Sequence, residues 1–192
     1  MTRRLLLALL VLLAVPATAS AQAPVPEGLS RTEPISVAGE TIPLAEIRRW
    51  ARIAARSGGS GPPGLPELTQ AADVLISQRW LEGEARASGI RVSERRVRRD
   101  LRRQAAESFP SRRALRRFLR RSGQTLADLR LRVRQDLLSS RLRDRALEGI
   151  DDPEEQMARL DAFVTDYRMR WLAQTRCTAF FTRLAEQSCP SG

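Results

Sequence analysis

The chain has 192 residues with a formal net charge of +11, a length that suffices for one domain with a hydrophobic core and a tail. The sequence contains no histidine, which removes the commonest general base and the commonest metal ligand. Two cysteines cannot close a structural zinc site alone, so we expect no metal, no cofactor and no catalytic residue.

The positive charge is concentrated in the middle of the chain, and every basic residue is an arginine. Residues 91–145 hold 19 arginines and six acidic residues, a net charge of +13. The flanking segments 22–90 and 146–192 carry net charges of −1 and −3. The basic character is therefore a property of one segment.

The first residues have the pattern of a signal peptide. Arg3 and Arg4 precede the apolar run Leu5–Val15, which is too short to span a bilayer comfortably. The small residues at 19–21 suit a signal peptidase, so we expect residues 1–21 to be removed by cleavage after Ala21. The mature protein would then be extracytoplasmic, either secreted or in the periplasm or cell-wall space. A retained membrane anchor is the alternative.

The segment after the predicted leader begins with a polar, proline-bearing lead-in, residues 22–34. Ile35 and Val37 then alternate with polar residues, Gly39 permits a turn, and residues 41–42 continue a short extended segment. The 3.6-residue periodicity predicts a first helix from Pro43 to about residue 57, which ends in a flexible connector rich in glycine, serine and proline.

Five further helices are predicted from periodicity and capping signals. Ser93 is the expected N-cap of the third helix, Thr125 with Asp128 forms a capping box before the fifth, and Asp152 caps the sixth. The predicted ranges are 66–88, 94–107, 112–121, 126–147 and 153–173. The fold class is therefore all-α, an irregular bundle of about six helices with one short extended segment at the start.

The arginine pairs of the third and fourth helices surround apolar residues at helical spacing. Val97, Leu101 and Ala105 recur every four residues, and arginines fill most of the remaining positions. A solvated helix face explains this pattern. The alternatives are an anionic membrane or cell-wall surface and an acidic unfolded polypeptide. We expect no nucleic-acid partner, because of the export signal and the lack of nucleic-acid-binding motifs. The candidate contacts to an anionic surface are Arg95, Arg99, Arg102, Arg103, Arg113, Arg116, Arg117 and Arg120.

The fifth helix has two apolar stripes on nearly opposite sides. One contains Leu126, Val133 and Leu137, and the other contains Leu131, Leu138 and Leu142. Such a helix must be covered on both sides or must present one side to a partner. Either the sixth helix covers the second stripe, or the stripe lines a binding groove.

The two cysteines, Cys177 and Cys189, lie twelve positions apart near the C-terminus. A disulfide between them suits an exported chain and would remove roughly 3 kcal/mol of unfolded-state freedom. Two unpaired thiols are the alternative.

Three motifs, in order, resemble the N-terminal chaperone module of the SurA/PrsA foldases, which is shared in outline with trigger factor. The first is VAGETI at 37–42 followed by Trp50. The second joins Leu81, Glu84 and Ala85 to Gly89, Ile90, Val92, Ser93 and Val97. The third is Gly123, Thr125, Leu129 and Arg130 at the opening of the long helix. The C-terminal WLAQTRC also looks like the cysteine-bearing tail of some exported foldases.

The resemblance implies a chaperone domain at 35–147, a closing helix at 148–176 that packs on it, and a disulfide-closed tail at 177–192. It implies an extracytoplasmic helper of folding that binds unfolded or nascent exported proteins without ATP. Many such foldases carry a parvulin-type prolyl isomerase domain before the closing helix, but here only residues 148–152 separate Leu147 from Pro153. The candidate client-binding residues are Trp50, Trp80, Leu131, Leu138 and Leu142.

Three functions are compatible with these sequence features. The first is an ATP-independent holdase. The second is a prolyl isomerase of unusual design, although without a parvulin domain or histidine we lean against an enzyme. The third is a relative of the isomerases that has lost the catalytic domain and acts as an adaptor at the envelope. The oligomeric state does not follow from the sequence.

Overall fold

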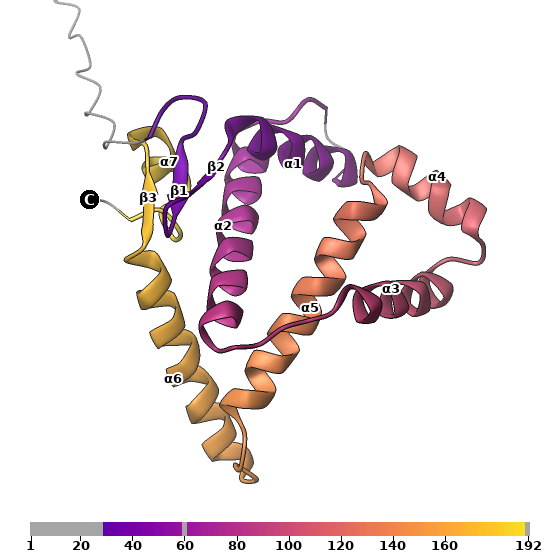
Figure 1. Cartoon of the computed structure of the whole chain (residues 1–192). Helices are drawn as coiled ribbons and strands as arrows, with labels where there is room; N and C mark the ends of the chain where they lie inside the picture. Colours follow the sequence, from indigo (N-terminus) through magenta and orange to yellow (C-terminus); the bar gives the residue numbers. More distant parts are fainter. Residues whose placement is uncertain (1–28, 59–60, 191–192) are drawn as a thin grey trace, which may run out of the picture.

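The computed structural model describes residues 29–58 and 61–190, which form three short strands and seven helices (Figure 1). The predicted signal peptide, its cleavage site after Ala21 and residues 22–28 lie outside the described residues. The mostly helical architecture confirms the predicted fold class.

A small antiparallel sheet joins the two ends of the described chain. β1 (Ile35–Val37) pairs on one side with β2 (Glu40–Ile42) and on the other with β3 (Thr175–Cys177). Ala38 and Gly39 form the turn between β1 and β2, with φ values of 49° and 84°, as a two-residue hairpin loop requires. The extended segment expected at the start thus forms two strands of a three-stranded sheet, with β1 in the centre, and the third strand, β3, was not predicted.

The six predicted helices are present. Their bounds are α1 (Leu44–Ser57), α2 (Leu65–Ala87), α3 (Glu94–Ser108), α4 (Arg112–Ser122), α5 (Leu126–Ala146) and α6 (Pro153–Leu172). The expected caps are also present: the side chains of Ser93, Thr125 and Asp152 each accept a hydrogen bond from a backbone N–H three residues later. A short α7 (Ala179–Leu184) follows β3.

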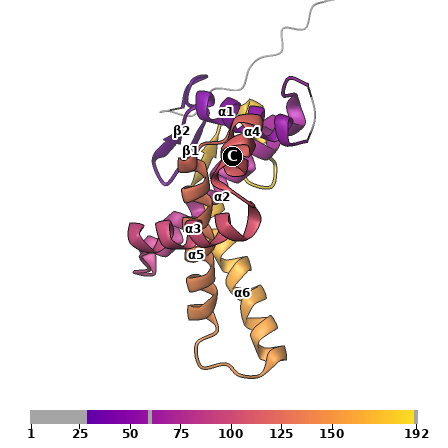
Figure 2. The same ribbon diagram turned by 90° about the vertical axis from the view of Figure 1, so that its right-hand side faces the viewer.

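The helices make two groups in space. α1 and α2 pack together beside the sheet, and α5 descends across α2 to form a V with α6 (Figures 1 and 2). α3 and α4 extend on the other side of α5, so that α3, α4 and α5 outline a triangle in Figure 1.

Two hydrophobic clusters hold these groups. The larger lies among the sheet, α1, α2, the end of α6 and α7 and includes Ile35, Ile76 and Trp80. The smaller joins α2, α3 and α5 and includes Val97, Val133 and Leu138. Leu142 also belongs to it, and Phe163 of α6 packs against it, so the second stripe of α5 is largely covered within the protein.

α6 is fixed to α2 by a close contact and a buried carboxylate. Gly83 lies against the Trp171 indole, where an added Cβ would overlap a ring carbon. Arg170 donates to both carboxylate oxygens of buried Glu84 at 2.7 and 2.8 Å, and Trp171 Nε1 donates to the same group at 2.7 Å. Burial, with a smaller contribution from Glu84, raises the pKa of the nearby Tyr167. The closing helix is therefore anchored through its last turns.

The tail after α6 is held by the predicted disulfide, because Cys177 and Cys189 are bonded. Among the described residues, no helix is long and apolar enough to cross a membrane.

Candidate functional site

A groove is bounded by α3, α4 and the start of α5, and is here called the α3–α4 groove. It encloses about 710 Å³, which lies within the usual range of ligand-binding pockets. Its lining residues are Arg98, Leu101, Arg102, Ala105, Ala106, Phe109, Pro110, Ser111, Arg112, Leu115, Arg116, Leu119, Leu126 and Arg130.

The apolar floor of the groove comes from helix faces that are only half covered. Val97 is fully buried against α5, whereas Leu101, one turn later on α3, is half-buried and lines the groove. Leu115 and Leu119 of α4 are also half-buried, and Leu126 at the start of α5 is 45% exposed. α4 thus contributes no fully buried apolar side chain to either core and presents its apolar side to the groove.

The connection between α3 and α4 closes one end of the groove. Phe109 and Phe118 pack with their ring centroids 5.3 Å apart, and Pro110 separates the two helices. Ser111 caps α4 by accepting a hydrogen bond from the Ala114 backbone N–H at 3.2 Å. The turn is therefore built by local packing and capping, which fixes α4 beside α3.

The rim of the groove is basic on both sides. Arg98 and Arg102 belong to α3, Arg112 and Arg116 to α4, and Arg130 to α5. All five are exposed, and within the described residues none of their side chains makes a hydrogen bond or an ion pair. Each guanidinium has five N–H donors, so the rim offers many free donors around an apolar floor.

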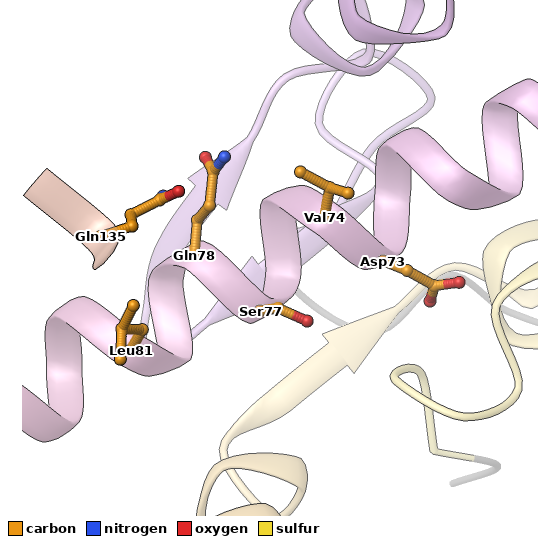
Figure 3. Close-up of a pocket in the computed structure, with 6 residues that line it drawn as sticks. All are labelled: Asp73, Val74, Ser77, Gln78, Leu81 and Gln135. Atoms are coloured by element: carbon orange, nitrogen blue, oxygen red, sulfur yellow. The ribbon is translucent and has the colours of Figure 1, made fainter. Parts of the chain in front are cut away.

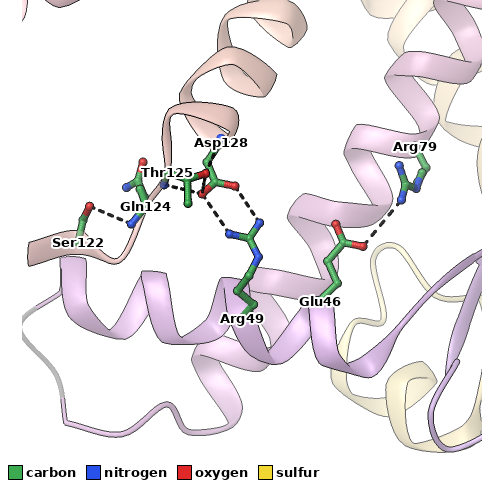
Figure 4. Close-up of polar contacts among 7 residues, drawn as sticks. All are labelled: Glu46, Arg49, Arg79, Ser122, Gln124, Thr125 and Asp128. Atoms are coloured by element: carbon green, nitrogen blue, oxygen red, sulfur yellow. Dashed lines mark hydrogen bonds and ion pairs between the residues drawn. The ribbon is translucent and has the colours of Figure 1, made fainter. Parts of the chain in front are cut away.

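The start of α5 is anchored to α1 by a network around Asp128 (Figure 4). Arg49 donates to both carboxylate oxygens at 2.8 and 3.1 Å, while the Thr125 backbone N–H and hydroxyl both donate at 2.8 Å. Burial alone would raise the pKa of Asp128, but these hydrogen bonds outweigh it and lower the pKa below its ordinary value. This network positions the α5 wall of the groove.

A second buried carboxylate stabilises α3. Asp100 is 2% exposed and accepts a hydrogen bond from Arg96 Nε at 2.7 Å, with Arg103 at 3.6 Å. The hydrogen bond from Arg96 lowers the pKa of Asp100. Arg96 and Arg103 are therefore neutralised within their own helix, unlike the rim arginines.

A smaller recess of about 320 Å³ lies between α2 and α5 (Figure 3). It is lined by Asp73, Val74, Ser77, Gln78, Leu81 and Gln135. The buried atoms Asp73 Oδ1 and Gln135 Nε2 have no hydrogen-bond partner, but in Figure 3 the two residues lie at opposite ends of the labelled set, and Asp73 points away from Gln135. Within the described residues, no hydrogen bond joins the Ser77 hydroxyl to the Asp73 carboxylate.

Four of the five predicted client-binding residues lie in or beside the two cores. Trp80 is 5% exposed and donates its indole N–H to Thr175 Oγ1 at 2.8 Å, and Leu138 and Leu142 are each 5% exposed. Trp50 packs against the larger core, and Leu131 is half-buried. In this conformation Trp80, Leu138 and Leu142 therefore stabilise the fold and expose almost no surface to a partner.

The eight predicted anionic-surface arginines are all exposed, but they divide into two sets. Arg102 and Arg116 line the groove, whereas Arg95, Arg99, Arg103, Arg113, Arg117 and Arg120 do not. Arg103 makes ion pairs with Asp100 and Glu107. The groove itself was not predicted from the sequence. One feature of the sequence could have indicated it: two short arginine-rich helices each have an apolar face, and no other predicted helix was assigned to pack against these faces.

Neither curated proteins nor solved structures gave a match to the chain. The family model of the SurA-like N-terminal domain matches residues 3–143, which includes α1 to α4 and most of α5. This match and the helical fold agree with the resemblance carried by the three sequence motifs. The chain therefore belongs to the family of SurA-like N-terminal domains, a family of chaperone-like foldases.

Proposed function

We propose that the protein is an extracytoplasmic, ATP-independent chaperone of the holdase type, which binds unfolded segments of exported proteins in the α3–α4 groove. Family membership supports a role in protein folding. The single observation that carries the proposal is a groove of about 710 Å³ with an apolar floor and a rim of unpaired arginines.

The apolar floor supplies the affinity that a holdase requires. Unfolded chains expose apolar side chains that folded proteins bury, and covering one Leu-sized side chain contributes about 1.5–3 kcal/mol. The floor is half-covered and is formed by side chains of three helices, so little ordering of the backbone is needed on binding.

Two features support the extracytoplasmic location. The disulfide between Cys177 and Cys189 is of the kind that persists in oxidising compartments. The sequence also begins with the pattern of a cleavable signal peptide.

Binding rather than isomerisation is proposed because of the connection between α5 and α6. Only residues 147–152 separate the two helices, so they join directly where many related foldases insert a parvulin domain. Phe163 of α6 packs against the smaller core, to which Leu138 and Leu142 of α5 belong.

A test of the proposal is suppression of aggregation of a chemically unfolded client, followed by light scattering without ATP. The wild-type protein should lower scattering at a several-fold molar excess. Leu126→Gln should weaken suppression several-fold, because Leu126 is exposed on the groove floor. Met157→Gln is the matched control, since Met157 is 64% exposed on α6 outside the groove. Unchanged scattering with the wild-type protein would reject the holdase function.

A second candidate is an adaptor that docks on an anionic envelope surface. The exposed arginines outside the groove, such as Arg95, Arg113 and Arg117, favour it. Co-sedimentation with anionic vesicles should then weaken steeply with added salt. Binding that is insensitive to salt would contradict this candidate.

A further inference from the structure

We propose that the α3–α4 groove selects client segments in which carboxylates flank an apolar anchor. This inference rests on the proposed function and adds a chemical class of client to it. The apolar part of the segment contacts the floor, and the aspartate or glutamate side chains reach the arginines of the two rims.

The first argument is that the rim lacks acidic partners of its own. Elsewhere in the molecule arginines satisfy carboxylates of this chain, as Arg49 does for Asp128 and Arg170 for Glu84. The groove lining contains no acidic residue among the residues described. The five rim guanidiniums therefore remain available to an external carboxylate.

The arrangement of the rim arginines also favours an acidic client. Arg98 and Arg102 are four residues apart on α3, so they project from the same side of that helix. Arg112 and Arg116 have the same spacing on α4. The floor lies between these two pairs, so a segment seated on it has guanidiniums on both sides. Guanidinium binds carboxylate through two parallel N–H donors, which makes the interaction directional as well as attractive.

The concave shape of the groove favours a polypeptide over a lipid surface as its partner. The floor residues Leu101, Leu115 and Leu119 are half-buried and recessed between helices, where a flat bilayer does not reach. A membrane would also attract the arginines inside and outside the groove alike, because surface potentials act over a Debye length. The concave floor with a basic rim therefore fits an acidic-apolar polypeptide.

The test compares three fluorescent peptides with one apolar core, flanked by glutamate, glutamine or lysine, by anisotropy with the full mature protein. The glutamate peptide should bind about tenfold more tightly than the glutamine peptide at physiological salt, and the lysine peptide more weakly than either. Added salt should narrow these differences. Equal affinities for the glutamate and glutamine peptides would overturn the inference.

Two double variants with the same change in charge locate the effect. Arg102→Gln/Arg116→Gln removes one rim arginine from each helix, and Arg99→Gln/Arg117→Gln removes two exposed arginines that do not line the groove. The first should reduce the preference for glutamate to about threefold or less, and the second should retain it. An equal loss in both variants would show an effect of net charge and reject the groove as its origin.

Two further outcomes separate this inference from the proposed function. If the glutamate and glutamine peptides bind equally and Leu126→Gln weakens both, the chaperone groove stands and the acidic selectivity is wrong. If none of the peptides binds and clients still aggregate, the proposed function fails as well. Anionic vesicles provide a further test. If they displace the glutamate peptide from the wild-type protein and bind both double variants equally weakly, the arginines bind a membrane and the inference is overturned.

Discussion

The carboxylate of Asp128 connects two helices through one side chain. It closes the capping box of α5 with Thr125 and accepts two hydrogen bonds from Arg49 of α1. The sequence predicted the capping box, because Thr and an acid three residues later are a local signal. It did not predict Arg49, which is 79 residues away. Local capping is readable from a sequence, whereas the long-range partner of the same group depends on how the helices pack.

Asp128→Asn should lower the free energy of unfolding by about 1–2 kcal/mol, because it removes the charge that Arg49 and Thr125 stabilise. The figure is modest because the Arg49 side chain is 38% exposed. Chemical denaturation at neutral pH measures the change. Asp136→Asn is the control on the same helix, since Asp136 is exposed. If Asp128→Asn and Asp136→Asn lower the free energy of unfolding equally, the role given to Asp128 is contradicted.

Acid should destabilise the protein through Asp128 and Asp100. The pKa of each is lower in the folded protein than in the unfolded chain, so the unfolded chain takes up protons first as the pH falls. The stability that the two ionised groups provide is present above about pH 4 and is lost as the pH falls through their folded-state pKa values. Denaturation curves at about pH 6 and about pH 3 should therefore differ more for the wild-type protein than for Asp128→Asn. Equal pH dependence in both proteins would contradict this linkage.

At the scale of the elements, the helices were predicted almost to the residue because each carries its own start signal. Ser93, Thr125 and Asp152 all occupy N-cap positions. β3 was missed because its three residues have no pattern of their own and pair with β1, about 140 positions earlier. The α3–α4 groove was missed for a related reason: periodicity shows that a helix has an apolar face but not what covers that face.

The contact between α2 and α6 gives a prediction at this scale. Replacement of a glycine in the middle of a helix by alanine ordinarily stabilises it by about 0.5–1 kcal/mol. Gly83→Ala should instead destabilise the protein by about 1–3 kcal/mol, because the new Cβ would overlap the Trp171 ring. Thermal and chemical denaturation show whether the free energy of unfolding rises or falls in Gly83→Ala.

The double variant Gly83→Ala/Trp171→Phe tests the origin of that cost. A smaller ring leaves space for the added methyl group, so the double variant should be less destabilised than the sum of the single variants. Additive effects would show that the cost of Gly83→Ala arises elsewhere than in its contact with Trp171.

At the scale of the whole molecule, the C-terminal segment completes a core that the N-terminal segment begins. Ile35 of β1 is paired with Ile42 on one side and with Cys177 on the other, and the disulfide ties Cys177 to the residues after α7. The disulfide and a closing helix are predictable from the sequence, whereas the extension of the sheet by β3 is not. That pairing joins two segments whose sequences contain no sign of each other.

Reduction of the disulfide should lower the free energy of unfolding by about 3 kcal/mol, because the bond spans twelve positions of the unfolded chain. Hydrogen exchange should increase mainly in β3 and α7, which lie beside the bond, and should change little in α3 and α4. The variant Cys177→Ser/Cys189→Ser should behave like the reduced protein. Increased exchange in α3 and α4 equal to that in β3 would contradict this assignment.

The central position of β1 in the sheet also determines the order in which the molecule can form when the chain is made, or exported as proposed above, from its N-terminus. β2 is available to β1 at once, but β3 becomes available only after residues 175–177 have emerged. Until then one edge of β1 and the apolar side chains that Trp171 and Phe181 cover have no partner. A protein proposed to protect unfolded chains thus has an unpaired strand edge of its own until β3 forms. Pairing of β1 with β3 is therefore among its last folding steps.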